Sequence, residues 1–528
     1  MGFNILVSDP LSKQGIQALL DAEDVQVDES TNLSENELLE VISNYDALLV
    51  RSQTKVTEEV LEAAHRLKVV GRAGVGVDNI DLEAASKKGV IVVNAPDGNT
   101  ISAAEHTFAM MMAAARRIPQ AYQSLTGGRW DRKTYRGVEL KGKTLGVVGL
   151  GRIGAEVAKR ARAFHMKVIA YDPFLTEERA GKLGIDKVSL DEAMENADFL
   201  TVHTPLIKET HHLIGQDQFE KMKPGVRIVN CARGGIIDET ALYEAIRKGK
   251  VAGAALDVFE EEPPLDNPLL KLPEVVVTPH LGASTAEAQE NVAVDVSEEV
   301  LRILRGEPFK NAVNLPPVSS EVMRKLEPYF LLAEKLGEIS VQLGKGTPVE
   351  VKIAYAGELT DVDTAPLTRT ILKGFLSHYL GSNANYVNAP HLAKQHDLGY
   401  TVEQTPKHRG FASLVTVTVK TEEDERLVAG TILNGYGPRI VKIDDYSIDI
   451  SPQDHLLLIR HTDRPGMIGR VGSILGQHEI NIGTMQVGRK GIGGKAMMAL
   501  TVDKKLEKAV IAELVKLEDI YSVRDIEL

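Results

Sequence analysis

A glycine-rich turn that follows an apolar stretch lies in the interior of this 528-residue chain. Residues 145–154, LGVVGLGRIG, place glycines at Gly149, Gly151 and Gly154 in a G-x-G-x-x-G pattern. In dinucleotide folds these glycines permit a tight turn, close approach of a pyrophosphate, and close packing of helix on strand. The following helix presents its N-terminus to the phosphates. The pattern predicts a Rossmann-like unit, and it leaves a long N-terminal segment to be explained.

An acidic residue at the end of the next predicted strand indicates which dinucleotide binds. The strand KVIAYDP ends at Asp172, a position from which a carboxylate can bond the ribose hydroxyls and repel a 2′-phosphate. We therefore expect NAD in preference to NADP. An Asp-Pro turn without a ligand role is the alternative. We expect Arg152, inside the glycine motif, to face the pyrophosphate.

The order of predicted elements divides the chain into four domains. Residues 1–98 alternate strand and helix, which indicates a parallel sheet. We predict a split substrate-binding domain, residues 1–98 and 285–316, into which a nucleotide domain, residues 99–284, is inserted, with the active site in the cleft between them. An α+β segment is predicted over residues 317–452. Residues 453–528 have β-α-β-β-α-β order, predict a ferredoxin-like domain, and are expected to fold separately.

A long alanine- and methionine-rich helix joins the first two domains. Its sequence, SAAEHTFAMMMAAARR, carries Ser102 and Glu105 at the spacing of a capping box. We therefore predict that this helix starts at Ser102 and that its methionines fill the core.

Composition excludes several classes of partner. A net charge of −13 argues against nucleic-acid and anionic-membrane surfaces. Cys231 is the single cysteine, so no intramolecular disulfide can form, as suits a reducing compartment. No run of about 18 apolar residues and no secretory signal pattern occur. We expect a cytoplasmic protein that binds no membrane and no structural metal.

Three predicted strand ends carry residues suited to catalysis: Arg233 in NCARGGIID, Glu262 in DVFEEEPP and His280 in VVVTPHLGAST. Ligands bind at the carboxyl ends of strands in open α/β sheets. An arginine can hold a carboxylate with a two-pronged contact, and a histidine can accept a proton near neutral pH. Glu262 can orient the histidine, although spacing leaves Glu260 and Glu261 as alternatives.

The N-terminal domain offers an anion site. The strand in LLVRS ends at Arg51 and Ser52, which suits a phosphate or carboxylate, although a surface ion pair is the alternative for Arg51. The turn GRAGVGVDN can form an anion nest from its backbone N–H groups at Gly74, Val75 and Gly76. Asn99 lies at the hinge before the long helix.

Five motifs in order, LGRIG, HTPL, NCARGG, DVFEEEPP and TPHLGAST, resemble the D-isomer-specific 2-hydroxyacid dehydrogenases over residues 1–316. LLVRS and GRAGVGVDNID narrow the resemblance to a long branch that oxidises 3-phosphoglycerate to 3-phosphohydroxypyruvate, the first step of serine biosynthesis. The resemblance implies a flavodoxin-like substrate domain, an intervening domain and a C-terminal ACT regulatory domain. It also implies that the catalytic residues are Arg233, Glu262 and His280, which decides the choice of glutamate.

Further site residues are carried over from the resemblance. It implies NAD contacts at Gly149, Gly151, Arg152, Ile153, Gly154, Asp172, Thr204, Cys231, Ala232, Arg233, Asp257, His280, Gly282 and Ala283. It implies substrate contacts at Arg51, Ser52, Gly74, Val75, Gly76, Asn99 and Arg132. The nucleotide domain is implied to form the main dimer interface of a homodimer or homotetramer, with Trp130 and Arg132 reaching toward the neighbouring subunit. Plain packing is the alternative for Trp130.

The C-terminal part contains two groups of polar residues. His461, Asp463 and Asn481 are candidates, from the ACT resemblance, for binding L-serine across two ACT domains; ordinary turn and cap chemistry is the alternative. Lys407, His408, Arg409 and Arg439 are basic in an acidic chain. They suit an anion site or a solvated face, and we favour the solvated face.

Two other functions are compatible with the sequence. A broader D-2-hydroxyacid dehydrogenase, acting on 2-hydroxyglutarate for example, would use Arg51 to bind a distal carboxylate. A non-catalytic NAD-sensing binding protein would use the fold without the reaction. A panel of substrates followed by NADH absorbance separates these possibilities.

Overall fold

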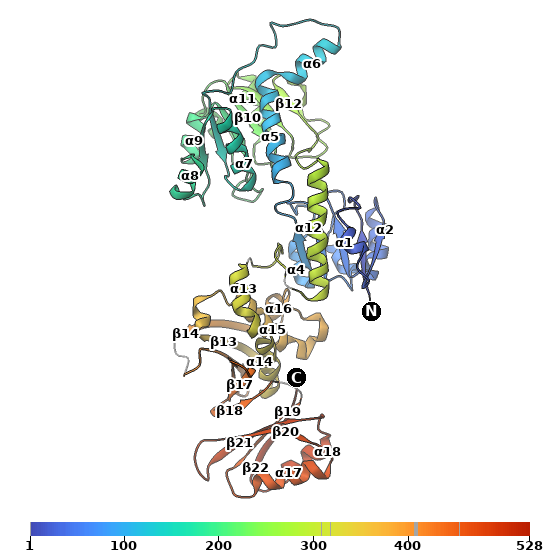
Figure 1. Cartoon of the computed structure of the whole chain (residues 1–528), viewed down its shortest axis with the longest axis vertical. Coiled ribbons are helices and arrows are strands. Elements are labelled where there is room, and N and C mark those ends of the chain that lie inside the picture. The colour runs from blue at the N-terminus through green and yellow to red at the C-terminus, as the bar shows by residue number, and fades with distance from the viewer. Residues whose placement is uncertain (1, 308, 317, 406–409, 453–454) are drawn as a thin grey trace.

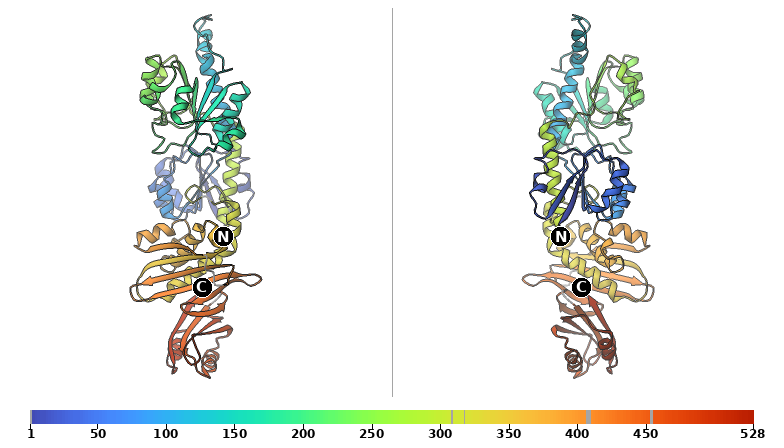
Figure 2. Two further views of the ribbon diagram at one scale, coloured as in Figure 1. Left: turned by 90° about the vertical axis from the view of Figure 1, so that its left-hand side faces the viewer. Right: turned by 90° about the vertical axis from the view of Figure 1, so that its right-hand side faces the viewer.

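The structure is a computed structural model that describes residues 2–307, 309–316, 318–405, 410–452 and 455–528. The chain is elongated, with four sheets that follow one another along its length (Figure 1). The nucleotide unit occupies one end and the C-terminal sheet the other, with the N-terminal unit and the intervening segment between them (Figure 2). No helix of the described residues is both long and apolar enough to cross a membrane.

The N-terminal sheet has the order β2-β1-β3-β4-β5 with every neighbouring pair parallel. This is the flavodoxin-like order, so the predicted fold is confirmed. β2, in which the alternating Val25 and Val27 are partly buried, was not predicted. The elements are β1 (Phe3–Val7), α1 (Gln17–Leu20), β2 (Val25–Glu29), α2 (Glu35–Val41), η1 (Ile42–Asn44), β3 (Ala47–Val50), α3 (Glu58–Ala63), β4 (Val69–Arg72), α4 (Leu82–Lys88) and β5 (Ile91–Asn94).

The chain returns to this sheet after the nucleotide unit. Helix α12 (Ala286–Arg305) packs its valines Val292, Val296 and Val300 into the same core as Ile5 and Val93. The residues that follow run beside β5, where Val313 donates its backbone N–H to the carbonyl of Val92 at 2.7 Å. The two segments predicted to form a split domain thus share one core, while the boundaries at 98, 284, 316 and 452 stay predictions.

The nucleotide sheet has seven parallel strands in the order β12-β11-β10-β9-β6-β7-β8. The order reverses between β6 and β9, which is the switch point where Rossmann-like sheets bind dinucleotides. The predicted Rossmann-like fold is confirmed. The elements are α5 (Thr100–Arg116), α6 (Ile118–Thr126), β6 (Thr144–Val148), α7 (Arg152–Ala163), β7 (Lys167–Tyr171), α8 (Glu177–Leu183), β8 (Asp186–Lys187), α9 (Leu190–Asn196), β9 (Phe199–Val202), α10 (Gln216–Lys221), β10 (Val226–Asn230), α11 (Glu239–Arg247), β11 (Val251–Leu256), η2 (Pro268–Lys271) and β12 (Val275–Val277).

The predicted capping box of α5 is wrong. The helix begins at Thr100, and its N-cap residue, Asn99, makes no side-chain cap. Ser102 lies inside the first turn and is buried, and its hydroxyl donates to the carbonyl of Gly282 at 2.9 Å. The serine therefore ties α5 to the loop after β12.

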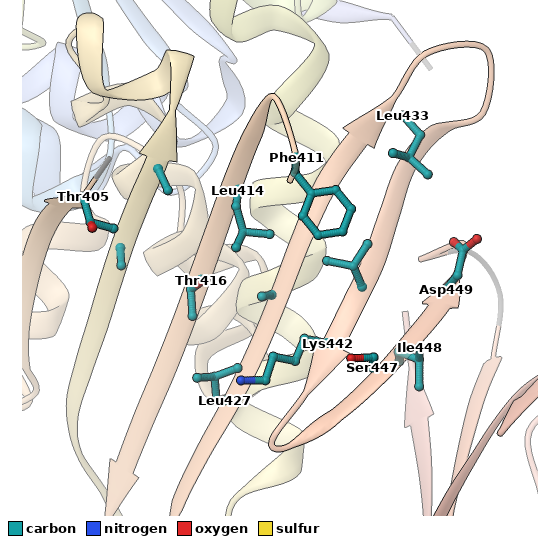
Figure 3. Close-up of a pocket in the computed structure, with 14 residues that line it drawn as sticks. Thr405, Phe411, Leu414, Thr416, Leu427, Leu433, Lys442, Ser447, Ile448 and Asp449 are labelled. Atoms are coloured by element: carbon teal, nitrogen blue, oxygen red, sulfur yellow. The ribbon is translucent and has the colours of Figure 1, made fainter. Parts of the chain in front are cut away.

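The intervening segment forms a six-stranded sheet in the order β14-β13-β15-β16-β17-β18, with α14 and α15 covering one face. The opposite face has a hollow of about 670 Å³, with an alanine floor and larger walls that include Phe411 and Leu414 (Figure 3). The elements are α13 (Ser320–Leu326), η3 (Glu327–Tyr329), α14 (Phe330–Leu343), β13 (Pro348–Gly357), η4 (Glu358–Asp361), α15 (Ala365–Leu380), η5 (Gly381–Asn383), α16 (Ala389–Gln395), β14 (Gly399–Thr405), β15 (Ser413–Thr421), β16 (Glu425–Leu433), β17 (Gly437–Ile443) and β18 (Tyr446–Ile450).

One member of the predicted basic group can be placed. Arg439 donates through Nε to Asp449 Oδ1 at 2.6 Å, so its charge is paired. Lys407, His408 and Arg409 lie outside the described residues.

The C-terminal sheet is antiparallel with the order β20-β21-β19-β22, and its helices pack on one face, as the ferredoxin-like prediction requires. Its elements are β19 (His455–Thr462), α17 (Met467–Gln477), β20 (Ile482–Arg489), β21 (Lys495–Val502), α18 (Lys508–Val515) and β22 (Ile520–Glu527).

The C-terminal unit shares a core with the intervening segment, and its separate folding stays a prediction. Leu456, Leu458 and Ile526, on the face of the sheet away from its helices, lie in one hydrophobic core with Leu336 of α14 and Ile443 of β17. Removal of the C-terminal unit would expose this apolar face to water, and apolar burial stabilises by roughly 25 cal/mol per Å².

Candidate functional site

His280 and Glu262 form a hydrogen-bonded pair at the carboxyl end of the nucleotide sheet. Nδ1 of His280 lies 2.8 Å from Oε2 of Glu262, and both side chains are partly exposed. Burial alone would raise the pKa of Glu262, but the bond to His280 and the N–H of Phe259 outweigh it, and the pKa is lowered. The imidazole is thus oriented by a carboxylate and keeps Nε2 for another partner.

Asp257 holds the loop that carries His280. Its fully buried carboxylate accepts from the Thr278 hydroxyl at 2.6 Å and from the backbone N–H groups of Leu281 and Gly282 at 2.8 Å each. Burial opposes ionisation, yet bonds from His106 and Thr278 hold the pKa of Asp257 below its usual value. Asp257 thus fixes the loop, and its contact with NAD stays a prediction.

Arg233 crosses from the nucleotide unit to the N-terminal unit. Its Nε donates to Asp78 Oδ2 at 3.0 Å, and its Nη1 donates to the carbonyl of Ala232 at 2.6 Å. A Cβ at Gly76 would lie 2.0 Å from Nη2 of Arg233, so only glycine leaves room there. The guanidinium group is therefore held against the predicted anion nest.

Arg72 belongs to the same group and was missed by the sequence analysis. It ends β4, and a Cβ at Gly74 (φ 155°) would lie 1.6 Å from its Nη1. Burial, together with the nearby charges of Arg233 and Arg51, lowers the pKa of Arg72 to about 10. Its Nε has no hydrogen-bond partner among the described residues. The signal was available, since Arg72 ends a predicted strand as Arg51 does.

The pairing of two strands explains why these arginines meet. Val50 of β3 lies opposite Arg72 of β4, so Arg51, the next residue, leaves the sheet at the same edge. The backbone N–H of Arg51 donates to Asp9 Oδ2 at 2.6 Å, which fixes the turn. Arg51 and Arg72 thus leave the N-terminal sheet at one edge, where Arg233 approaches from the nucleotide unit, an arrangement suited to a doubly charged anion.

The remaining predicted substrate residues differ in position. Ser52 is exposed at this edge, and the carbonyl of Val75 accepts from Asn94 Nδ2 at 2.5 Å. Asn99 lies at the start of α5, where its buried Oδ1 has no partner among the described residues. Arg132 is exposed beyond α6, at the far end of the nucleotide unit from the N-terminal sheet (Figure 1). The structure therefore does not bring Arg132 to the cleft of its own chain.

The glycine turn after β6 has the shape that a dinucleotide requires. Gly149 has φ 91°, in the region that favours glycine, and a Cβ there would lie 2.8 Å from the carbonyl oxygen of His203. Gly151 caps α7 and faces open space. Thr204, beside Gly149, has a buried hydroxyl without a partner among the described residues. Open space and an unpaired hydroxyl at a helix N-terminus fit a bound dinucleotide.

Asp172 is fixed beside this turn. Its Oδ2 accepts from the backbone N–H of Leu150 and its Oδ1 from that of Phe174, each at 2.8 Å. Each carboxylate oxygen keeps a lone pair that can accept from a ribose hydroxyl.

The other predicted nucleotide contacts surround the same edge of the sheet. Arg152 donates to Asp97 Oδ1 at 2.6 Å, across to the N-terminal unit, and its contact with the pyrophosphate stays a prediction. Burial, with Asp257 nearby, raises the pKa of the Cys231 thiol, which therefore stays protonated. Ile153 lies in the first turn of α7, Gly154 is buried behind it, and Ala283 follows Gly282. Their contacts with the dinucleotide stay predictions.

The three predicted regulatory residues do not meet within one chain. His461 of β19 and Arg489 of β20 both lie opposite Ala496, whereas His455 of β19 and Ile482 of β20 both lie opposite Val502. Asp463, just after β19, and Asn481, just before β20, are therefore at opposite ends of the sheet. His461 is buried with its Nε2 unpartnered among the described residues, and Asp463 accepts from the N–H of Gly493 at 3.3 Å.

Three family models match the chain in order. Residues 108–282 match the D-isomer specific 2-hydroxyacid dehydrogenase NAD binding domain, residues 325–444 the D-3-phosphoglycerate dehydrogenase intervening domain, and residues 455–519 the ACT domain. Curated relatives match along nearly the whole length. The D-3-phosphoglycerate dehydrogenase of Bacillus subtilis is 49% identical over 526 residues, covering 100% of each chain. That of Methanocaldococcus jannaschii is 49% identical over 523 residues, covering 99% of this chain and 98% of the relative.

The chain belongs to the D-3-phosphoglycerate dehydrogenase family. It is therefore an NAD-dependent oxidoreductase. Solved structures match the catalytic part of this family. The Thermus thermophilus TT0316 protein aligns with a TM-score of 0.55 at 35% identity, covering 59% of this chain and 99% of that one. The Aquifex aeolicus D-lactate dehydrogenase, solved with NAD and lactic acid, aligns with a TM-score of 0.53 at 32% identity, covering 59% and 99%.

The position of Asp172 predicts how cofactor preference can be changed. Asp172→Ser should raise KM for NAD and improve relative use of NADP, because the repulsive carboxylate and a ribose contact are both lost. Steady-state kinetics with each cofactor measure this ratio. Asp186→Ser, which removes an exposed carboxylate from β8, is the matched control and should leave the ratio unchanged. A wild type that already prefers NADP would contradict the assignment.

Proposed function

We propose that this chain oxidises 3-phospho-D-glycerate to 3-phosphohydroxypyruvate, the first step of L-serine biosynthesis. The observation that carries the proposal is the position of the His280–Glu262 pair and Arg233 at the edge of one parallel sheet, opposite Arg51 and Arg72 at the edge of the other. A substrate with a carboxylate, a C2 hydroxyl and a phosphate matches these groups. The sequence relatives named above carry this activity in their names.

The arginines bind and orient the substrate. Arg233 receives the C1 carboxylate beside the N–H groups of the Gly74–Gly76 turn. Arg51 and Arg72 receive the phosphate. A dianion can offset the burial of the Arg72 charge and its repulsion by Arg233 and Arg51, which together lower the pKa of Arg72. Because this contact is charge-based, a substrate without the phosphate loses most of it.

His280 moves the proton. Nε2 of His280 accepts the proton of the C2 hydroxyl as the C2–H bond breaks, and the hydroxyl becomes the carbonyl of the product. Glu262, on Nδ1, stabilises the imidazolium that forms. NAD, bound along the Gly149–Gly154 turn and Asp172, supplies the acceptor for the C2 hydride.

Replacement of the base tests the reaction. His280→Ala should lower kcat by roughly 10²–10⁴-fold, the usual contribution of a general base. NADH affinity, measured by fluorescence titration, should change far less. Near-normal turnover would remove His280 from the mechanism.

Replacement of Arg72 tests the phosphate site. Arg72→Gln should raise KM for 3-phosphoglycerate by roughly 10–100-fold, the equivalent of about 1.5–3 kcal/mol for a charge-assisted bond. Steady-state kinetics with 3-phosphoglycerate and D-glycerate should show that the preference for the phosphorylated substrate falls. Lys68→Gln removes a cation from the other end of the same strand and is the control. Equal KM values for the two variants would place the phosphate elsewhere.

We further propose a homodimer through the nucleotide unit, or a homotetramer built from it. Helix α6 and the following segment extend from this unit and expose Ile118, Tyr122, Leu125 and Trp130 (Figure 1). Exposed apolar residues gathered on one projecting arm favour contact with a second subunit. Arg132, on this arm, would reach the partner's cleft. The single cysteine suits a cytoplasmic location.

L-serine is the proposed effector. Because Asp463 and Asn481 lie at opposite ends of one sheet, a site that uses both needs two ACT domains. Asp463 would hold the ammonium group of one serine, and Asn481 would come from the neighbouring domain. The shared core with α14 gives the C-terminal unit a direct mechanical connection to the rest of the chain.

A point variant of the full chain tests the serine site. Asp463→Ala should keep the dehydrogenase activity and weaken serine binding by about 1–3 kcal/mol, because a charge-assisted hydrogen bond is lost. Isothermal titration calorimetry of L-serine measures the change. Glu518→Ala, at an exposed position of the same unit, should bind serine as the wild type does. Equal affinity in both variants would place the effector site elsewhere.

A further inference from the structure

Three neighbouring loops carry the predicted catalytic and cofactor residues of the nucleotide unit. They follow β9, β10 and β11, which are adjacent strands, and they carry Thr204, Arg233 and Glu262 respectively. The mechanism requires these residues to keep a fixed geometry. Among the described residues, no hydrogen bond joins the side chain of one of these three residues to that of another. Other residues must therefore hold the loops together.

Two glutamates outside the proposed catalytic group connect the loops that follow β10 and β11. The backbone N–H of Glu260 donates to Oε1 of Glu239 at 2.7 Å, and the backbone N–H of Glu239 lies 3.3 Å from Oε1 of Glu260. Asn267 donates through Nδ2 to the second oxygen of Glu239 at 2.5 Å. We call Glu239, Glu260 and His212 the clasp. Each glutamate bonds the backbone of the other, which fixes both loops at once.

His212 connects the loop after β9. Its Nε2 lies 3.0 Å from Oε1 of Glu260, and its backbone N–H donates to the carbonyl of Gly235 at 2.7 Å. The ring of His211 stacks on that of His212 with centroids 3.9 Å apart. Glu260, in the loop after β11, is therefore bonded both to His212 of the loop after β9 and to Glu239, which follows β10.

Backbone packing shows that the contact is close. A Cβ at Gly234 would lie 1.8 Å from the carbonyl oxygen of Phe259, so the loop with Arg233 and the loop with Glu262 meet backbone to backbone. Glu239 is partly buried at this junction, and burial raises its pKa although the Glu260 N–H and Asn267 oppose the effect. Four polar groups converge on the two glutamates at this junction.

We propose that Glu239 and Glu260 are positioning residues that set the distance between Arg233 and the Glu262–His280 pair. Glu260 lies two residues before Glu262, and Glu239 lies six residues after Arg233, so release of the clasp frees both catalytic loops. A misplacement of about 1 Å can cost roughly 100-fold in rate. This inference rests on the proposed function, because its effect appears in the turnover of 3-phosphoglycerate.

Glu239→Ala tests the proposal, with Glu239→Gln as the conservative variant and Glu244→Ala as the control. Glu244 is exposed on the same helix, α11. Three quantities are measured on the full-length protein: kcat with saturating NAD and 3-phosphoglycerate, the dissociation constant of NADH, and the melting temperature. Glu260→Ala, at an exposed side chain, is a second variant if Glu239→Ala does not fold.

We expect kcat to fall by about tenfold or more in Glu239→Ala and Glu260→Ala, with NADH affinity kept. Glu239→Gln should recover most of the rate, because its Oε1 still accepts from the Glu260 N–H. A wild-type kcat in both alanine variants would overturn the proposal. Parallel losses of kcat, NADH affinity and melting temperature would also overturn it, because they indicate a structural role only. Absence of 3-phosphoglycerate oxidation in the wild type would instead overturn the proposed function.

Discussion

The ion pair between Arg233 and Asp78 joins the two units that form the cleft. It also balances part of the positive charge of the arginines that gather there, and the rest of the site depends on that balance. Parallel strands direct their carboxyl ends to one edge of a sheet. Here the edges of two such sheets face each other, so Arg51, Arg72 and Arg233 come together. Burial lowers the pKa of Arg72, and the like charges of Arg233 and Arg51 contribute to the same shift, so gathering these cations is unfavourable. Asp78 and Asp9 offset part of this charge, and the two anionic groups of the proposed substrate would offset the rest.

The ACT domain is attached to the intervening segment by side-chain packing as well as by the chain that connects them. Leu456 and Leu458 face the core of the intervening segment, while Leu457 between them faces the helices of its own sheet. This alternation is ordinary for a strand that is covered on both faces. Because Leu456 and Leu458 pack in one core with α14, a displacement of the ACT domain strand changes the packing of α14. In the proposed regulation, serine bound between two such domains restrains the relative positions of the chains that carry them.

The sequence predicted the parts of the site that lie at strand ends and failed where contacts are non-local. His280, Glu262 and Arg233 were found because each follows an apolar strand. Arg72 was missed although it has the same setting, because its neighbours Arg51 and Arg233 come from other strands and only the sheet order reveals them. Ser102 and Glu105 have the spacing of a capping box, but the Ser102 hydroxyl donates to the buried carbonyl of Gly282 instead. Spacing along a chain carries no information about such competing partners.

Local patterns by themselves determined the fold classes, the glycine turn, the acid at Asp172 and the identity of the histidine, since each depends on a few consecutive residues and on strand or helix periodicity. Spacing left Glu260 and Glu261 as alternatives to Glu262, and the family resemblance favoured Glu262. The tertiary structure shows that Glu262 pairs with His280, while Glu260 in the same loop bonds His212. It also decided that Arg152 pairs with Asp97, and that Asp463 and Asn481 lie at opposite ends of a sheet. These outcomes depend on strand register and on distances between segments far apart in the chain, which the order of residues leaves open.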